Sequence, residues 1–285
     1  MLGVAGAIWR YWFIRGHLAE GRLRLERALA TDERPTAARA RALRGAAVLT
    51  FNLGDIASAR PWAEESLSLH RRLEDAWGTA IALHVLGGQL VEEGDPGRAV
   101  PLIEESVQCF NELGDDKYAL MATSNLAWAY AELGDRDRAR VQHEEVLGRA
   151  RGLRDERQEA HSLFELATFA LDDGDVADAT SMLKASLRIF HGHGELLSIR
   201  IDLSLIAAVL AREGRGRRAA LLLSAAHALQ SEIGGSSFVW LEERDQQTLA
   251  TVSTQLDEVV FAEAWESGRR LAVDEAVEYA LASID

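Results

Sequence analysis

The sequence places a glycine at the same point of a local pattern every 40 residues. In four of the five copies this glycine is followed by aspartate, and small and apolar residues precede it. The five glycines are Gly54, Gly94, Gly134, Gly174 and Gly214. A second series with the same period falls between them, at Leu73, Leu113, Leu153, His193 and Ile233. A fixed period of this length predicts a solenoid, a chain of stacked and repeated supersecondary units.

The segments between the two series have the length and the apolar period of helices. In the stretch DKYALMATSNLAWAYAELGD, steps of three and four residues connect Leu120, Thr123, Leu126, Ala127 and Tyr130. Glycine suits the left-handed turn that ends a helix, because it has no Cβ. The aspartate that follows can accept hydrogen bonds from the N–H groups that open the next helix. Each repeat therefore predicts two antiparallel helices.

Small residues occupy one position of each predicted helix. In the first helix of successive repeats these are Gly87, Ala127, Ala167 and Ala207, and in the second helix Ala59, Ala99, Ala139, Ala179 and Ala219. Two antiparallel helices approach closely where a side chain is nearly absent, and we expect Leu86, Leu126, Leu166 and Ile206 to fill the seam beside them. The predicted fold is all-α, with about six helix pairs over residues 1–235. Three C-terminal helices, beginning at about residue 238, are expected to cap it over residues 236–285.

Charge and cysteine content exclude several classes of function. The 285 residues carry a net charge of −14, which argues against nucleic acid as a direct partner, because phosphate binding needs clustered Lys and Arg. The first 50 residues instead carry nine Arg and four acidic groups. They form either an ordinary solvated surface or a set of basic helices that faces an acidic neighbour. The single cysteine, Cys109, fits a reducing compartment, and we interpret it as a half-buried structural thiol.

No segment approaches the roughly 18 consecutive apolar residues that a membrane span requires. The apolar stretch at the N-terminus lacks a basic leader and is interrupted by Arg10, so it does not fit an export signal. We therefore expect a cytoplasmic protein without a membrane partner.

No arrangement of residues predicts catalysis, a cofactor or a bound metal. The sequence lacks the Gly-x-x-x-x-Gly-Lys-[Ser/Thr] loop that cradles nucleotide phosphates. His191 and His193 lie two residues apart at a predicted turn, and we interpret them as solvent-exposed because no further ligand lies at metal-binding spacing. The paired carboxylates keep the 40-residue register on second helices, which indicates a solvated outer face. These pairs are Glu64-Glu65, Glu104-Glu105 and Glu144-Glu145. We expect a protein that is not an enzyme and that holds no cofactor.

The repeat resembles the tetratricopeptide repeat family. The family pattern of Leu, a small residue, an aromatic residue, Gly-Asp and Ala is matched by Leu126, Ala127, Tyr130, Gly134, Asp135 and Ala139. The resemblance covers roughly residues 1–235 and implies a right-handed α-α superhelix. The period of 40 residues exceeds the usual length of about 34. The longer unit resembles the variant found in the sensor arms of large signal-transduction ATPases.

Both ends of the chain resemble the same subgroup, the repeat region of bacterial STAND regulators with an NB-ARC-type nucleotide switch. The segments concerned are residues 10–29 and residues 261–281. In that subgroup the repeats follow an ATPase and an effector domain and sense a ligand or partner. The resemblance implies a non-catalytic interaction or sensor module, the arm of a multidomain transcriptional or signal-transduction regulator. Its ATPase and effector would lie next to the N-terminus, outside this chain. The alternative is a free-standing adaptor that binds a protein or peptide.

The resemblance also implies where a partner binds. In this architecture the first helices line a concave groove, and the residues projected onto that face include His84, Met121, Ser124, Asn125, Trp128, His161, Phe164 and Thr168. Asn125 falls in the slot where peptide-clamping members often carry Asn. Aromatic, methionine and small polar side chains together suit a peptide, an apolar helix or a small-molecule inducer. The alternative is that most of these residues pack between helices.

The first repeat carries an aromatic cluster, Trp9, Trp12 and Phe13. A solenoid normally needs a polar cap at its end, so the cluster predicts a docking surface for a missing domain or partner, or a first repeat that is truncated. The alternative is a core cluster covered by the second repeat. The sequence does not identify the partner, the oligomeric state or the direction of regulation.

Overall fold

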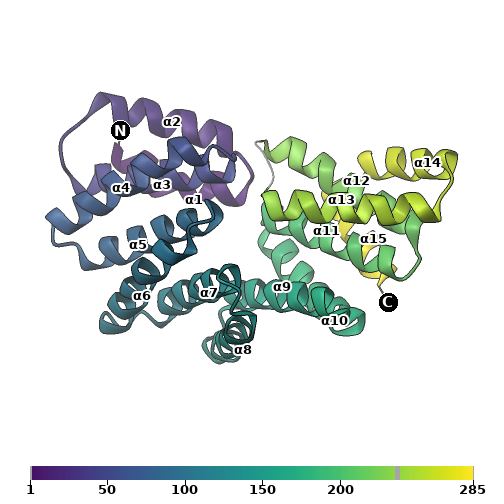
Figure 1. The fold of residues 1–285 in the computed structure, drawn as a ribbon. Helices are drawn as coiled ribbons and strands as arrows, with labels where there is room; N and C mark the ends of the chain where they lie inside the picture. The colour runs from purple at the N-terminus through teal and green to yellow at the C-terminus, as the bar shows by residue number, and fades with distance from the viewer. Residues whose placement is uncertain (1, 235–237, 285) are drawn as a thin grey trace. The chain divides into compact units, whose positions relative to one another are not determined.

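The computed structural model describes residues 2–234 and 238–284, and all the regular structure in these ranges is α-helical (Figure 1). The first eight helices are α1 (Leu2–Ile14), α2 (Leu18–Thr31), α3 (Ala37–Asn52), α4 (Ile56–Arg72), α5 (Ala76–Glu92), α6 (Pro96–Glu112), α7 (Asp116–Glu132) and α8 (Arg136–Leu153). The others are α9 (Glu156–Asp173), α10 (Val176–His193), α11 (Leu196–Arg212), α12 (Gly216–Ile233), α13 (Val239–Gln255), α14 (Glu258–Arg269) and α15 (Val273–Ser283). The prediction of an all-α helical solenoid is confirmed.

Both predicted series of turns lie between helices. The five glycines of the first series have positive φ angles between 76° and 87°, the left-handed conformation that favours glycine. In the second series, the residue with the positive φ angle directly follows the residue that defined the 40-residue period. These residues are Glu74, Gly114, Arg154, Gly194 and Gly234. A backbone conformation with positive φ therefore recurs every 40 residues, both within and between the helix pairs.

Aspartate caps most of the helices that follow these turns. Asp135 Oδ1 accepts a hydrogen bond from the backbone N–H of Arg138, at the start of α8, over 3.3 Å. The same bond is made by Asp55, Asp75, Asp95, Asp115, Asp155 and Asp175. In the last repeat Arg215 stands in this place, and it makes no such bond. Gly-Asp thus ends one helix and begins its partner, as predicted.

The small residues lie at the seam between the paired helices. All nine are buried, and a Cβ on Gly87 would come within 2.4 Å of Ile103 on the neighbouring α6. Leu126 beside them is 7% exposed. The close approach of α5 and α6 therefore depends on the missing side chain at residue 87.

The chain divides into two compact units. Unit 1 comprises Met1–Phe13 and His17–Ser162, and unit 2 comprises Ile14–Gly16 and Leu163–Asp285. In unit 1 the first helices of successive pairs, α3, α5 and α7, contact one another. The sequence predicted a boundary between residues 235 and 236, which lies outside the described residues. The three C-terminal helices are present as α13, α14 and α15.

In unit 2 the C-terminal helices cover the last helix pair. Figure 1 shows α13 alongside α11 and α12, and both pairs are in contact. Every residue of α11 from Ile199 to Ala211 is buried. The first helix of this pair is therefore enclosed on all sides, which distinguishes it from the first helices of unit 1.

Candidate partner-binding surface

The predicted groove residues lie on the first helices and are all partly exposed. Six belong to unit 1, namely His84 on α5, Met121, Ser124, Asn125 and Trp128 on α7, and His161 on α9. Phe164 and Thr168 lie further along α9, in unit 2. The six residues of unit 1 are the ones considered below as one surface, which we call the first-helix surface.

Asn125 is placed by a glycine of the preceding first helix. A Cβ on Gly88 would lie 3.1 Å from Asn125 Nδ2, so α5 makes room for the amide of α7. Gly88 itself is buried, whereas Asn125 remains partly exposed. The amide thus lies where the first helices α5 and α7 meet. A side chain in this position can bind the backbone of an extended peptide.

Both histidines of this surface are neutral at pH 7. Burial, with a smaller contribution from the charge of Arg44, lowers the pKa of His84 to about 4. Burial lowers the pKa of His161 to about 3, with a smaller contribution from the charge of Arg157. Neither imidazole therefore supplies positive charge to a ligand at neutral pH.

Two of the predicted residues also make contacts within the fold. Met121 packs against the buried cluster of Ala80, Ile81, Phe110, Ala119 and Ala122. Cys109 packs against the same cluster and is half-buried, as predicted. Thr168 Oγ1 donates a hydrogen bond to the carbonyl of Phe164, one turn earlier in α9, over 3.0 Å. The alternative of packing between helices therefore describes part of the role of Met121, whereas the Thr168 bond stays within α9.

The aromatic cluster of α1 is divided between core and surface. Trp12 is 6% exposed, and a Cβ on Gly21 would lie 2.8 Å from its Cβ, so it packs inside unit 1. Trp9 and Phe13 are partly exposed, with ring centroids 6.4 Å apart. The core alternative is therefore correct for Trp12, and a docking role stays a prediction for Trp9 and Phe13.

Sequence reasoning missed the most unusual residue of this region, Arg44 on α3. The side chain is 7% exposed, and its guanidinium carbon lies 6.0 Å from the ring centre of Trp9 and 5.3 Å from that of Trp77. Its Nε and Nη1 atoms are buried without a hydrogen-bond partner. The signal was available, because residue 44 precedes His84 by one 40-residue period. Arg44 is thus the first member of the slot that continues with His84 and Ser124.

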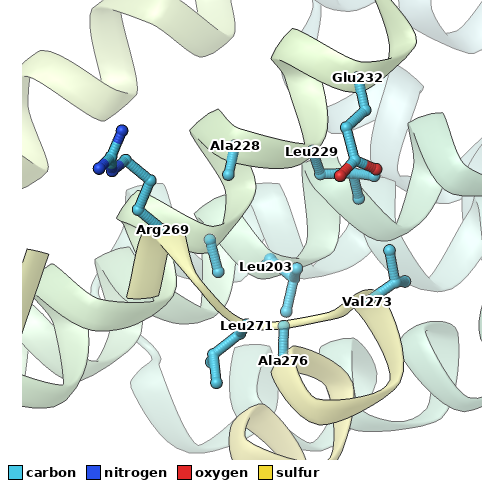
Figure 2. Close-up of a pocket in the computed structure, with 9 residues that line it drawn as sticks. Leu203, Ala228, Leu229, Glu232, Arg269, Leu271, Val273 and Ala276 are labelled. Carbon is cyan, nitrogen blue, oxygen red and sulfur yellow. The ribbon is translucent and has the colours of Figure 1, made fainter. Parts of the chain in front are cut away.

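Two cavities lie among the described residues, one in each unit. Figure 2 shows one in unit 2, of about 30 Å³, which is room for about one water molecule. Its wall includes Leu203 of α11, Leu229 of α12 and Ala276 of α15. A larger hollow of about 330 Å³ lies along α4 in unit 1, beside Glu64, Ser68 and Arg71. Its wall combines these exposed polar side chains with the buried Leu67 of α4 and Leu86 of α5.

Two searches of the described residues were negative. Within residues 2–234 and 238–284, no three His, Cys, Asp or Glu side chains gather in a way that could hold a metal ion. Over the same ranges, no helix combines the length and apolar character needed to cross a membrane.

Family models and solved structures show what the chain is similar to. Two family models, both described as tetratricopeptide repeat, match residues 39–75 and residues 78–152. The chain therefore contains tetratricopeptide repeats in the part that includes α3 to α8. No curated protein matches the sequence. Repeat solenoids of this kind are generally non-catalytic modules with extended surfaces for protein or peptide partners.

Three solved structures have a similar arrangement of helices. BtubC (BKLC) from P. vanneervenii is 18% identical, with a TM-score of 0.51 over 79% of this chain and 92% of that one. The Rap conjugation gene regulator of the plasmid pLS20, in complex with the Phr* peptide, is 13% identical. Its TM-score is 0.62, over 89% of this chain and 73% of that one. A putative kinesin light chain of Podosopora anserina with nearly identical TPR-like repeats is 20% identical, with a TM-score of 0.49 over 65% and 92% of the two chains. At these identities the likeness concerns the fold.

Proposed function

We propose that unit 1 binds a protein or peptide partner on its first-helix surface. The observation that carries this proposal is the row of partly exposed side chains on α5 and α7, with Asn125 seated against Gly88. An amide can bind a peptide backbone, and an aromatic ring such as that of Trp128 can hold an apolar side chain. The pLS20 regulator, which shares the fold, is described in complex with a peptide, and this supports a peptide-sized partner.

A peptide selection tests this function without a known partner. Displayed random peptides would be selected on the purified chain, and the affinity of the selected peptides measured on variants. We expect Trp128→Ala and Asn125→Ala each to weaken binding about tenfold or more, because each removes a contact at the centre of the surface. Glu144→Ala is the matched control, since Glu144 is exposed on α8. Equal binding to all three variants would place the partner elsewhere.

We also infer that this module is the sensor arm of a multidomain transcriptional or signal-transduction regulator. The 40-residue unit supports this, as does the resemblance of residues 10–29 and 261–281 to the ends of such arms. In this proposal residues 1–235 sense a protein, a peptide or a small-molecule inducer in the cytoplasm, and residues 236–285 cap them. An ATPase and an effector domain lie next to the N-terminus. Trp9 and Phe13 then belong to the surface on which the ATPase docks.

The size of the native protein distinguishes a regulator from an adaptor. An antibody raised against this chain should detect a species much larger than 31.3 kDa in the source cells, and the adjoining coding sequence should contain a nucleotide phosphate loop. A native species of 31.3 kDa, with no such loop encoded next to it, would favour the free-standing adaptor instead.

A further inference from the structure

In unit 2 a helix of the chain itself packs into the groove between two second helices. This helix is α15, which contacts the second helices α10 and α12 and the first helix α11 that comes between them in the chain. Ala276 of α15 and Leu203 of α11 line the same small cavity (Figure 2). At the start of α15, Asp274 Oδ1 is hydrogen-bonded to His191 Nε2 of α10 over 2.7 Å. The groove therefore holds a short helix by apolar contacts and by a polar contact at the helix start.

α15 is a short amphipathic helix with an acidic start. Ala276, Val277 and Ala280 are buried, whereas Asp274 and Glu275 are exposed in the first turn. Acidic side chains stabilise this end of a helix, because the unpaired N–H groups there carry partial positive charge. Small and branched apolar residues on one face let the helix lie close to its neighbours. α15 thus shows which kind of helix fits a groove of this repeat.

The corresponding groove of unit 1 contains the hollow of about 330 Å³. Three 40-residue periods before α10, α11 and α12 lie α4, α5 and α6. In this register His191 corresponds to Arg71, and Ala225 of α12 corresponds to Glu105 of α6. Arg71 Nη2 donates to both carboxylate oxygens of Glu105, over 2.7 and 2.9 Å. The Arg71 side of α4 therefore faces α6, as the His191 side of α10 faces α15.

The floor of the hollow is apolar. Leu67 of α4 and Leu86 of α5 belong to its wall, and each is 7% exposed. Ile206, which corresponds to Leu86 in unit 2, is 0% exposed. The volume lies within the range of about 300–1,000 Å³ that is typical of binding pockets. The apolar face that is fully covered in unit 2 is thus left slightly open in unit 1.

The end of the hollow that corresponds to the start of α15 is positively charged. Arg71 and Arg72 lie in the last turn of α4, and both line the hollow. The side chains of Arg71 and Glu105 are 49% and 43% exposed, and an ion pair so exposed contributes little to stability. Arg72 is exposed and has no ion-pair partner within the described residues. Glu64, the acid of the wall, pairs with Arg60 over 3.1 Å. A carboxylate that enters at this end can therefore pair with either arginine.

We propose that the hollow along α4 and α5 binds an amphipathic helix of a partner protein, and that the first turn of this helix is acidic. The apolar face of the helix covers Leu67 and Leu86, and its acidic first turn faces Arg71 and Arg72. The lining of the hollow shares no residue with the first-helix surface. The hollow is therefore a second binding site, which goes beyond the proposed function.

Two pools of helical peptides built on the pattern of α15 test this site. Both pools randomise the positions of Ala276, Val277 and Ala280 among Ala, Val, Leu and Ile. The first pool keeps Asp-Glu in the first turn, and the second has Asn-Gln there. We expect the first pool to bind the full chain about three- to fivefold more tightly at low salt, because exposed ion pairs are modest in strength. Equal binding of the two pools, or no binding by either, overturns the proposal.

Ser68→Trp locates the bound peptides. Ser68 is an exposed residue of the hollow wall, so an indole in its place fills the hollow and should weaken binding of the first pool about tenfold or more. Ser253→Trp, the matched control, places the same side chain on the exposed face of α13 and should leave the affinity unchanged. All measurements are made below the Tm of each variant. Binding to Ser68→Trp as tight as to wild type would refute the site.

Arg72→Glu tests the role of charge. We expect this variant to lose the preference for the acidic pool, because the carboxylates of the first turn would then meet a like charge. Arg27→Glu makes the same change at an exposed residue of α2 and should keep the preference. A preference that both variants retain in full would show that the arginine of the hollow does not bind the acidic turn.

Failure of this site can be told apart from failure of the proposed function. Peptide binding that Trp128→Ala weakens and Ser68→Trp leaves unchanged would place the peptides on the first-helix surface. That result would refute the second site and keep the proposed function. Binding that Ser68→Trp weakens and Trp128→Ala leaves unchanged would support the second site.

Discussion

At the scale of single residues, the turns of this chain depend on left-handed backbone conformations. Most are occupied by glycine, yet Glu74 and Arg154 adopt φ angles of 53° at two of them. A residue with a Cβ in this conformation costs about 1 kcal/mol or more. These two turns still form at the same phase of the repeat, so the packing of the flanking helices outweighs the local preference of one residue.

Two glycines with open surroundings isolate this backbone effect. A Cβ on Gly134, in the turn with φ 87°, or on Gly148, inside α8, would meet nothing within 4 Å. We expect Gly134→Ala to destabilise the protein by about 1 kcal/mol and Gly148→Ala to stabilise it by about 0.5–1 kcal/mol. Urea unfolding measures both changes. A loss of stability in Gly148→Ala as large as in Gly134→Ala would show that the sign of φ is not the cause.

A buried histidine predicts a pH dependence. His143 of α8 is 1% exposed, and burial lowers its pKa from 6.5 to about 4. Because the unfolded chain binds this proton more tightly, stability is lost as the pH falls through 6.5 towards 4. At pH 5 the loss from this group is about 2 kcal/mol relative to pH 7. His143→Gln should lose about 2 kcal/mol less than wild type between these pH values in urea unfolding, whereas an unchanged difference would exclude His143 as the titrating group.

At the scale of helices, buried serines connect paired helices in the same way in two repeats. Ser66 Oγ donates to the carbonyl of Ala40 over 2.8 Å, and Ser106 Oγ donates to that of Ala80 over 2.7 Å. Each bond joins a second helix to the first helix of its own pair. The bonds satisfy hydroxyls that burial would otherwise penalise, so the register between paired helices is fixed by polar as well as apolar contacts.

The seam between paired helices should be sensitive to cavities. Leu126 is 7% exposed, next to the small residue Ala127. We expect Leu126→Ala to cost about 2–5 kcal/mol, because the cavity it leaves is only partly filled by relaxation. Leu133→Ala is the matched control on the same stretch of chain, since Leu133 is 51% exposed, and it should cost under about 0.5 kcal/mol. A cost for Leu126→Ala as small as that of the control would place Leu126 outside the seam.

At the scale of the whole molecule, the 40-residue repeat made most of the helices and turns predictable. Single contacts that do not recur with the repeat were not predicted. Gly134 and Asp135 mark a helix end by local chemistry, which needs no knowledge of distant contacts. Arg44 was missed because the groove was projected from the third helix pair onward, beginning with His84 on α5. The C-terminal cap was predicted, but the pairing of Arg200 with Asp245 that joins α11 to α13 was not, since these residues lie 45 positions apart and outside the periodic pattern.

That pairing predicts how far a local defect spreads. Asp245 is 3% exposed, and it neutralises the buried Arg200 while also hydrogen-bonding His227 Nε2 over 3.1 Å. Asp245→Ala leaves the Arg200 charge buried and unpaired, so we expect a cost of about 3–5 kcal/mol. Solenoid repeats interact mainly with their neighbours. Amide hydrogen exchange should therefore quicken in α11 and α13 of unit 2, while α5 of unit 1 keeps its protection. Glu243→Ala, which removes an exposed carboxylate of the same helix, should change neither. Equal loss of protection in α5 and α11 after Asp245→Ala would instead show that the two units unfold as one.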